Sequence, residues 1–134
     1  MPMITVRYVT PTPQPEMRSR IAQAAARLGA EQLGKDPSVT AVLVEAVDPD
    51  GWFIAGKKPM DAGLSASWMD IKMTAGTNTK GETTAFVAAA FAAMTGILGP
   101  LHEETHVLVH AADGDPYGYG GRTRNGRWAA AHPG

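Results

Sequence analysis

Residues 40–50 read TAVLVEAVDPD and residues 105–115 read THVLVHAADGD, so one pattern recurs without a gap after a shift of 65 positions. The same shift pairs further residues of like type or place: Trp52 with Tyr117, Gly56 with Gly121, and Pro2 with Ser67. Self-similarity at one fixed offset indicates two copies of one supersecondary unit.

Each copy is predicted to run strand, helix, strand. Apolar residues at every second position, the period of a strand with one solvated face, open the copies at Ile4, Val6 and Tyr8 and at Ile71 and Met73. The runs at residues 42–44 and 107–109 are rich in valine and lead into turns that contain Asp and Gly. They predict the second strand of each copy.

Apolar residues at steps of three and four predict a helix in each copy. In the first copy these residues are Met17, Ile21, Ala24 and Leu28, and Gly34 closes the segment. In the second copy Thr79, followed three residues later by Glu82, predicts a capping box at the start of the helix. The apolar stripe expected after it is Val87, Ala90, Phe91 and Met94, ended by Gly96 or Gly99.

These elements predict an α/β (α+β) fold in which two tandem βαβ repeats form one four-stranded sheet with both helices on one face. We expect a single domain over residues 1–134, with repeats at 1–56 and 67–121, a linker at 57–66 and a C-terminal tail at 122–134. The other face of such a sheet is bare. We therefore expect a closed homo-oligomer, with a trimer as the preferred form.

Composition narrows the class of protein and its partners. The 134 residues are 44% hydrophobic and 19% charged, enough for the core of one compact domain. A net charge of −1 disfavours nucleic acid as a partner. The longest unbroken apolar run, residues 85–94, is shorter than the roughly 20 residues that cross a bilayer, and no signal pattern opens the chain, so we expect a cytoplasmic protein with no membrane partner. The chain has no cysteine, which excludes disulfides, thiolate nucleophiles and sulfur-ligated metals.

The N-terminal Met-Pro, the amphipathic first helix, and a strand followed by DGWFIAG at residues 50–56 together resemble the tautomerase superfamily, of the 4-oxalocrotonate tautomerase-like type. Two such units in one chain look most like its cis-3-chloroacrylic acid dehalogenase branch, on residues 47–55, 74–77 and 119–122. The resemblance covers nearly the whole chain. It implies the β-α-β tautomerase fold, a trimer of fused dimers, no metal or organic cofactor, and Pro2, exposed by removal of Met1, as the catalytic group.

An N-terminal proline has a chemistry that internal prolines lack, because its nitrogen is a free secondary amine on a rigid ring. The pKa of an α-amine lies near ~7.7–8.0, and an apolar pocket lowers it. Such an amine can take a proton from a carbon beside a carbonyl, or from an enol oxygen, and return it elsewhere. Ser67, at the matching place of the second copy, lies inside the chain and has no free amine, so we expect one reactive centre per chain.

The chain departs from the dehalogenase branch at several functional positions. Residues that hold the substrate carboxylate or activate water in that branch fall on Thr74, Thr77, Gly29, Leu108 and Gly118. We therefore expect a tautomerase or isomerase that catalyses keto–enol or 1,3-proton shifts on small 2-oxo or 2-hydroxydiene acids. A hydratase or low-level dehalogenase of unsaturated acids, and a non-catalytic oligomeric ligand-binding homologue, stay open as alternatives.

The candidate substrate-binding residues are chosen for what they offer a small carboxylic or keto acid. Cations and hydroxyls suit its oxygens, and aromatic rings suit its apolar part. His106 lies where simpler 4-oxalocrotonate tautomerases place a substrate-binding arginine. The candidates are Arg7, Lys72, Arg122, Thr74, Thr77, His106, Trp52, Phe53, Tyr117 and Tyr119.

Two further patterns are given structural interpretations. His102, His106 and His110 are four residues apart on a predicted strand, which separates neighbours by ~13 Å and is too far for one metal ion. Residues 118–121, Gly-Tyr-Gly-Gly, predict a hairpin-like turn or lid rather than a phosphate-binding loop.

Overall fold

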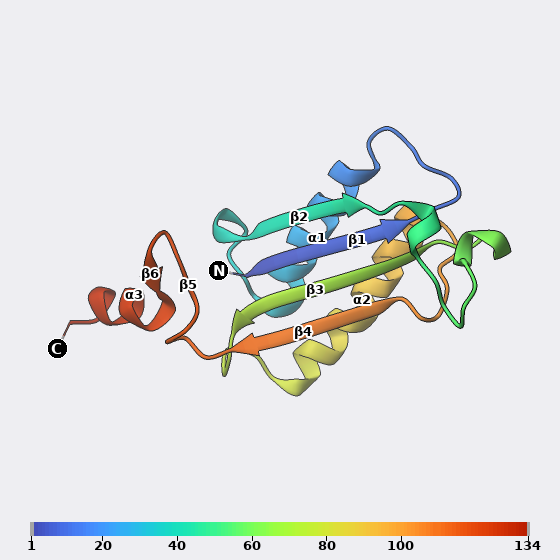
Figure 1. Ribbon diagram of the computed structural model, residues 1–134. Coiled ribbons are helices and arrows are strands. Elements are labelled where there is room, and N and C mark those ends of the chain that lie inside the picture. Colours follow the sequence, from blue (N-terminus) through green and yellow to red (C-terminus); the bar gives the residue numbers. More distant parts are fainter. Residues whose placement is uncertain (1, 134) are drawn as a thin grey trace.

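The computed structural model describes residues 2–133 and has one layer of strands backed by one layer of helices (Figure 1). Within that range the main sheet has four strands, in the order β2-β1-β3-β4. The sheet and its two connecting helices are β1 (Met3–Val9), α1 (Met17–Leu33), β2 (Ala41–Ala46), β3 (Ala66–Thr74), α2 (Lys80–Leu98) and β4 (His106–Ala112). A small hairpin of β5 (Gly118–Tyr119) and β6 (Arg122–Thr123) and a helix α3 (Arg124–Ala131) follow.

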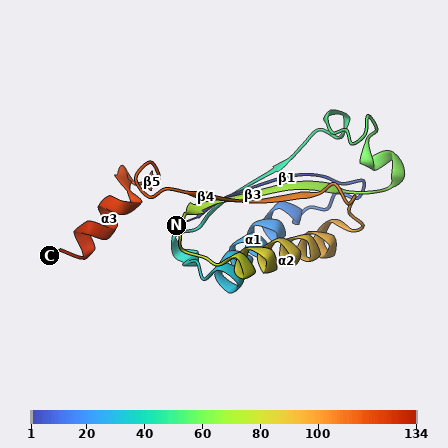
Figure 2. The same ribbon diagram turned by 90° about the horizontal axis from the view of Figure 1, so that it is seen from below.

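The strand pairing confirms the two βαβ units. β1 pairs with β2 in parallel and β3 pairs with β4 in parallel, each pair joined by one crossover helix. The two units meet through the antiparallel pair β1 and β3, in which Ile4 lies opposite Ile71 and Tyr8 lies opposite Ser67. Both crossover helices cover the same face of the sheet, as predicted (Figure 2).

The core lies between the sheet and the two helices. The alternation along β1 and β3 sends apolar side chains such as Ile4 and Ile71 into it, and both are fully buried. Burying a side chain of this size contributes about 1.5–3 kcal/mol to the free energy of folding. This layer therefore holds the two repeats together.

The apolar stripe of the second helix differs from the prediction. Its buried residues are Phe86, Ala90, Met94 and Leu98. Val87 and Phe91, predicted to face the core, are exposed. The helix is alanine-rich and apolar almost all the way round, so periodicity alone leaves its rotation undetermined. By length and composition α2 would also suit a membrane span, but here its buried stripe packs against the sheet.

The helix ends follow the local sequence. Thr79 Oγ1 accepts from the Glu82 amide at 3.1 Å and the Glu82 carboxylate accepts from the Thr79 amide at 2.8 Å, so the predicted capping box is present. Gly34 ends α1 in the left-handed conformation, with φ of 66°. Gly99 caps α2, whereas Gly96 lies inside it.

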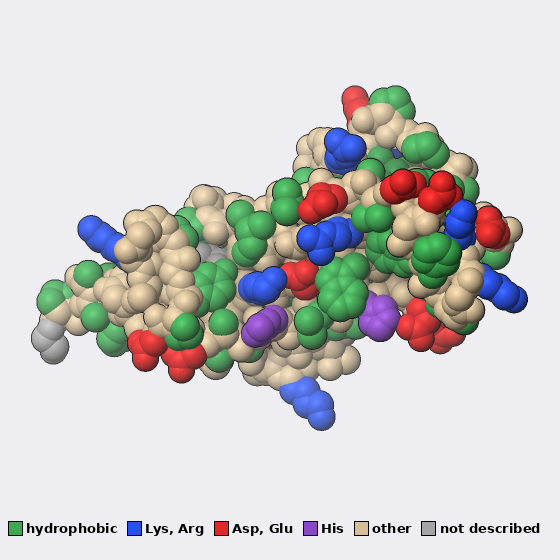
Figure 3. All heavy atoms as spheres, in the orientation of Figure 1, with side chains coloured by type: hydrophobic (Ala, Val, Ile, Leu, Met, Phe, Trp, Pro, Cys, Tyr) green, Lys and Arg blue, Asp and Glu red, His purple; other side chains and the backbone are tan. Residues whose placement is uncertain are grey.

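The face of the sheet away from the helices is open within the described chain. Figure 3 looks onto it and shows acidic, basic, histidine and apolar side chains mixed across the surface. Leu43 and Leu108, at the two edge strands, are each 46% exposed. The hairpin and α3 extend beyond one end of the sheet, so the segment predicted only as a tail contains a helix (Figure 1). Gly134, the last residue of the predicted tail, lies outside the described residues.

Candidate active site

Pro2 lies at the start of the central strand β1 and is buried. Its carbonyl accepts a hydrogen bond from the Ala41 amide at 3.1 Å, which extends the pairing of β1 with β2 by one residue. The backbone on the carbonyl side of the proline ring is therefore held by the sheet. Met1 lies outside the described residues.

A cavity of about 550 Å³ opens beside Pro2, at the end of the sheet where β1 begins and β3 and β4 end. This volume is in the range of small-molecule sites. Most of its lining is apolar, and Lys72 is the only lining residue of the described chain with a charged side chain. The lining consists of Pro2, Met3, Val39, Ala41, Lys72, Ala112, Pro116, Tyr117, Gly118 and Tyr119.

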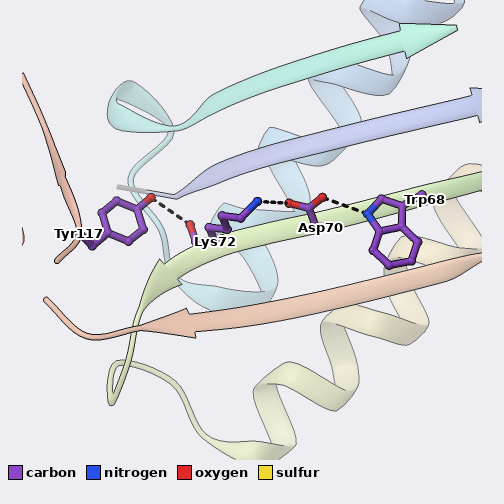
Figure 4. Close-up of polar contacts among 4 residues, drawn as sticks. All are labelled: Trp68, Asp70, Lys72 and Tyr117. Atoms are coloured by element: carbon purple, nitrogen blue, oxygen red, sulfur yellow. Dashed lines mark hydrogen bonds and ion pairs between the residues drawn. The ribbon is translucent and has the colours of Figure 1, made fainter. Parts of the chain in front are cut away.

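Tyr117 joins the C-terminal segment to the strand that carries Pro2. Its hydroxyl donates to the Lys72 carbonyl at 3.0 Å and accepts from the backbone of Met3 (Figure 4). Burial raises the pKa of the Tyr117 phenol above its usual value of 10.0. The phenol is therefore neutral at pH 7, and its proton is engaged by the backbone of β3.

Lys72 is held from the opposite side by a buried carboxylate. Its Nζ lies 3.1 Å from Asp70 Oδ1, and the other carboxylate oxygen accepts from the Trp68 indole nitrogen at 3.0 Å (Figure 4). Asp70 is 8% exposed, whereas the Lys72 side chain is 51% exposed. Asp70 thus restrains the ammonium, which lies on the Asp70 side of Lys72 and keeps donors that Asp70 does not use.

The β5-β6 hairpin places Tyr119 at the cavity and confirms the turn predicted at residues 118–121. Gly120 and Gly121 both have positive φ, 60° and 79°, as a two-residue hairpin turn requires. The Arg127 guanidinium donates to the Tyr119 carbonyl at 2.8 Å and lies 3.9 Å from the centre of its ring. These contacts fix the wall opposite β1.

The structure brings three of the ten candidate substrate-binding residues to Pro2, namely Lys72, Tyr117 and Tyr119. Thr74 ends β3, and Thr77 lies just beyond it, where its hydroxyl accepts from Lys35 Nζ at 2.9 Å. Arg122 lies opposite Tyr119 in the hairpin but is not among the residues that line the cavity. Arg7 lies on the open face of the sheet, 3.6 Å from Glu45.

The remaining three candidates lie at the other end of the sheet. Trp52, Phe53 and His106 line a separate cavity around Ser67. In the described chain they are therefore not part of the Pro2 site.

Sequence analysis did not identify the apolar lining residues or Lys35. Met3, Val39, Ala112 and Pro116 shape the Pro2 cavity, yet aliphatic residues at strand ends and in loops carry no pattern that separates them from ordinary core or turn residues. Lys35 follows the glycine that ends α1, and burial lowers the pKa of its ammonium below 10.5. Its bond to Thr77 is a contact that only the fold reveals.

The described residues contain no group of three or more His, Asp or Glu side chains that could hold a metal ion. What the site does offer is a buried proline, one restrained ammonium and a neutral phenol around a largely apolar space. Such a space favours a small substrate with a carboxylate at one end.

Two comparisons match part of the chain to tautomerases. Residues 2–62 match the family model described as Tautomerase enzyme. Half of the chain is also similar to the Probable tautomerase K2 of Dickeya dadantii (strain 3937), with 27% identity over 67 residues that cover 50% of this chain and 100% of that protein.

Solved structures match nearly the whole chain in fold. A fused 4-OT described as a wild-type symmetric trimer superposes with a TM-score of 0.80 at 14% identity, covering 93% of this chain and 98% of the other. The macrophage migration inhibitory factor-like protein of Entamoeba histolytica superposes with a TM-score of 0.74 at 19% identity, covering 91% and 97%. A tautomerase family model thus matches residues 2–62, somewhat less than half of the chain, and the fold of nearly the whole chain is similar to that of fused 4-OT.

Proposed function

We propose that the chain is a cofactor-independent tautomerase in which Pro2, freed by removal of Met1, serves as general base and acid. The observation that carries this proposal is the position of Pro2: it is buried, fixed by the sheet, and borders a mostly apolar cavity with a single cation, Lys72. The substrates proposed are small 2-oxo or 2-hydroxydiene acids.

The surroundings of Pro2 suit a neutral amine. An ammonium at this position would lose hydration without gaining a carboxylate, because the lining residues of the described chain include no Asp or Glu. The pKa of the freed amine is therefore expected below the ~7.7–8.0 of an ordinary α-amine. The unprotonated form then predominates at neutral pH and can act as a base.

The proposed reaction moves one proton and leaves the atom count of the substrate unchanged. The Pro2 nitrogen accepts a proton from the enol oxygen, the electron pair shifts through the double bond, and the resulting ammonium donates its proton to carbon. Lys72 binds the substrate carboxylate through donors that Asp70 leaves free. Tyr117 acts on the shape of the site, because its hydroxyl is already bonded to the backbone at Lys72 and Met3.

We propose a homotrimer as the working form. The fused 4-OT with a TM-score of 0.80 is described as a trimer, and the open face of the present sheet carries exposed leucines on both edge strands. Burying such a face is a general reason for one-layer folds to oligomerise. Trp52, Phe53 or His106 of one subunit would then be able to approach a neighbouring subunit.

The branch of the tautomerase superfamily that the chain resembles is also part of this proposal. The similarity to the cis-3-chloroacrylic acid dehalogenase branch rests on the motifs at residues 47–55, 74–77 and 119–122. A hydratase or dehalogenase would need a group that activates water, and the Pro2 cavity has no carboxylate or imidazole among its described lining residues. A non-catalytic ligand-binding homologue fits the likeness to a migration inhibitory factor-like protein.

The test is the rate of phenylpyruvate enol–keto conversion by protein whose loss of Met1 has been checked by intact mass. Pro2→Ala is expected to lower kcat by about 100-fold, within the usual range for a general base, whereas Pro13→Ala, in an exposed loop, leaves it unchanged. An unchanged rate in Pro2→Ala would refute the proposal. Turnover of an acetylenic acid with water incorporation would favour the hydratase instead, and ligand binding without turnover would favour the non-catalytic homologue.

A further inference from the structure

A second cavity, of about 690 Å³, lies at the opposite end of the sheet from Pro2. It borders the start of the second repeat at Ser67, as the first cavity borders the start of the first repeat at Pro2. Its described lining residues are Trp52, Phe53, Ile54, Ala55, Ser67, Trp68, His102, Glu104 and His106.

The internal repeat relates the two cavities residue by residue. The shift of 65 positions places Ser67 on Pro2, Trp68 on Met3 and Trp52 on Tyr117, and all of these residues line their respective cavities. The 65-position correspondence also holds for the hairpin turn at the side of each cavity. The bridge between Ile54 and Lys57 repeats the pairing of Tyr119 with Arg122.

The turn that shapes the second cavity is strained. Ala55 has a φ of 52°, and it is the only non-glycine residue with positive φ in the described chain. The corresponding position of the other hairpin is Gly120, which tolerates this conformation. A non-glycine residue held in this region indicates that the turn geometry is imposed by its surroundings. The turn directs Phe53, 57% exposed, to the edge of the cavity.

The second cavity has lost the proton-transfer chemistry. The Ser67 nitrogen is a peptide amide that donates to Thr105 Oγ1 at 3.4 Å, so it is not a base. Ser67 is also not set up as a nucleophile, because the Nε2 of His106 is occupied by Glu104 at 2.9 Å. The described lining of this cavity therefore lacks a counterpart of the Pro2 amine.

The chemistry that remains points to a particular ligand. Three aromatic side chains, Trp52, Phe53 and Trp68, line the cavity, and Trp68 stacks on His106 with ring centroids 5.5 Å apart. Glu104 supplies a carboxylate, one oxygen of which lies 2.9 Å from His106 Nε2, and the described lining includes two histidines but no lysine or arginine. Aromatic faces and a carboxylate favour a cation and disfavour an anion.

A buried polar atom next to the cavity has no partner. Ser67 is 1% exposed, and its Oγ has no hydrogen-bond partner among the described residues. A hydroxyl in that situation lowers stability. Because side chains alternate along a strand, the Ser67 hydroxyl lies on the face of β3 that carries the core residues Met69 and Ile71 and is not offered to a ligand.

We infer that this second cavity binds an arylalkyl ammonium ion, with its ring against Trp52, Phe53 and Trp68 and its ammonium group at Glu104. The inference does not depend on proton transfer at Pro2. It assigns the two ends of one sheet opposite charge preferences, since Lys72 is the charged group at the first cavity and Glu104 is the carboxylate at the second.

The test uses 2-phenylethylamine, phenylacetate and 2-phenylethanol as matched probes on the full chain, with affinity measured by calorimetry. The amine is expected to bind, and phenylacetate is expected to bind more weakly. Glu104→Gln should weaken amine binding about fivefold, the effect of losing one partly exposed ion pair, without changing the affinity for the neutral alcohol. Glu103→Gln, an exposed neighbour outside the lining, is the control and should change neither.

The position of the ligand is read from the indole N–H signals of the ¹⁵N-labelled protein. The signals of Trp52 and Trp68 should shift with the amine, whereas that of Trp128 in α3 should not. Ser67→Ala should raise the Tm of the free protein, because an unpartnered buried hydroxyl is removed. Three results would each overturn the inference. The first is equal binding of amine and acid, and the second is an amine affinity that Glu104→Gln does not change. The third is the absence of a shift at Trp52 and Trp68, as expected if a neighbouring subunit covers Phe53.

Discussion

Replacing Lys72 by Met separates substrate recognition from proton transfer at the Pro2 site. The variant keeps much of the length and apolar volume of the side chain but removes its charge. A hydrogen bond to a charged group contributes about 1.5–3 kcal/mol, and the 51% exposure of Lys72 places the expected loss near the lower end. About 1.4 kcal/mol corresponds to tenfold in kcat/KM. We therefore expect kcat/KM for phenylpyruvate to fall about tenfold, mostly through KM.

The matched substrate is the methyl ester of phenylpyruvate, which enolises in the same way but carries no carboxylate. Its turnover should be unchanged within about twofold, since the amine of Pro2 is not altered. Lys80→Met, at the exposed first residue of α2, controls for loss of one positive charge from the protein surface. The Tm of each variant is measured because Asp70 loses one of its two side-chain donors in Lys72→Met and retains Trp68. Equal losses with acid and ester, or no loss with either, would refute the assignment of Lys72 to the carboxylate.

Three further predictions concern the fold. Phe86→Ala should lower the free energy of unfolding by about 3–5 kcal/mol in urea titrations. Phe91→Ala, on the exposed face of the same helix, should lower it by less than about 1 kcal/mol. Similar losses in the two variants would mean that α2 is rotated from the described orientation. Gly34→Ala should cost about 1 kcal/mol through its left-handed φ, because no atom lies close enough to clash with the added methyl group, and an unchanged urea midpoint would contradict this. Hydrogen bonding to Thr79 lowers the pKa of Glu82 below 4.5 in the folded state, so the stability that the Glu82 carboxylate contributes is present above pH 4.5 and is lost as the pH falls through the lower folded pKa. Glu82→Gln should flatten this part of the curve of stability against pH. An unchanged acid dependence of stability would argue against this role of Glu82.

The fold could be predicted because its signals repeat. The capping box at Thr79, the closing Gly34 and the valine runs of the second strands each specify one element. The closing glycine and the valine run recur in the second copy after the 65-residue shift. The rotation of α2 could not be predicted in the same way. An alanine-rich helix is apolar on several faces, so its sequence does not indicate which face is buried. Packing against the sheet buries Phe86 and leaves Phe91 exposed.

The candidate site was predictable only where residues carry distinctive chemistry. Lys72, Tyr117 and Tyr119 were chosen for charge or aromaticity, and the fold places them with Pro2. Trp52 is a candidate for the same reason but lines the other cavity, because the chemistry of a residue does not indicate at which end of the sheet it lies. That information comes only from the strand pairing.

The strand pairing also explains how one chain can hold two unlike cavities. β1 and β3 are antiparallel, with Met3 opposite Lys72 and Tyr8 opposite Ser67. The starts of the two repeats therefore lie at opposite ends of the sheet, ~20 Å apart at about 3.3 Å per residue along β1. At that separation no small ligand touches both sites. A substitution at Ser67 or Glu104 therefore leaves the direct contacts of Pro2 unchanged, and the second cavity is free to acquire a binding chemistry of its own.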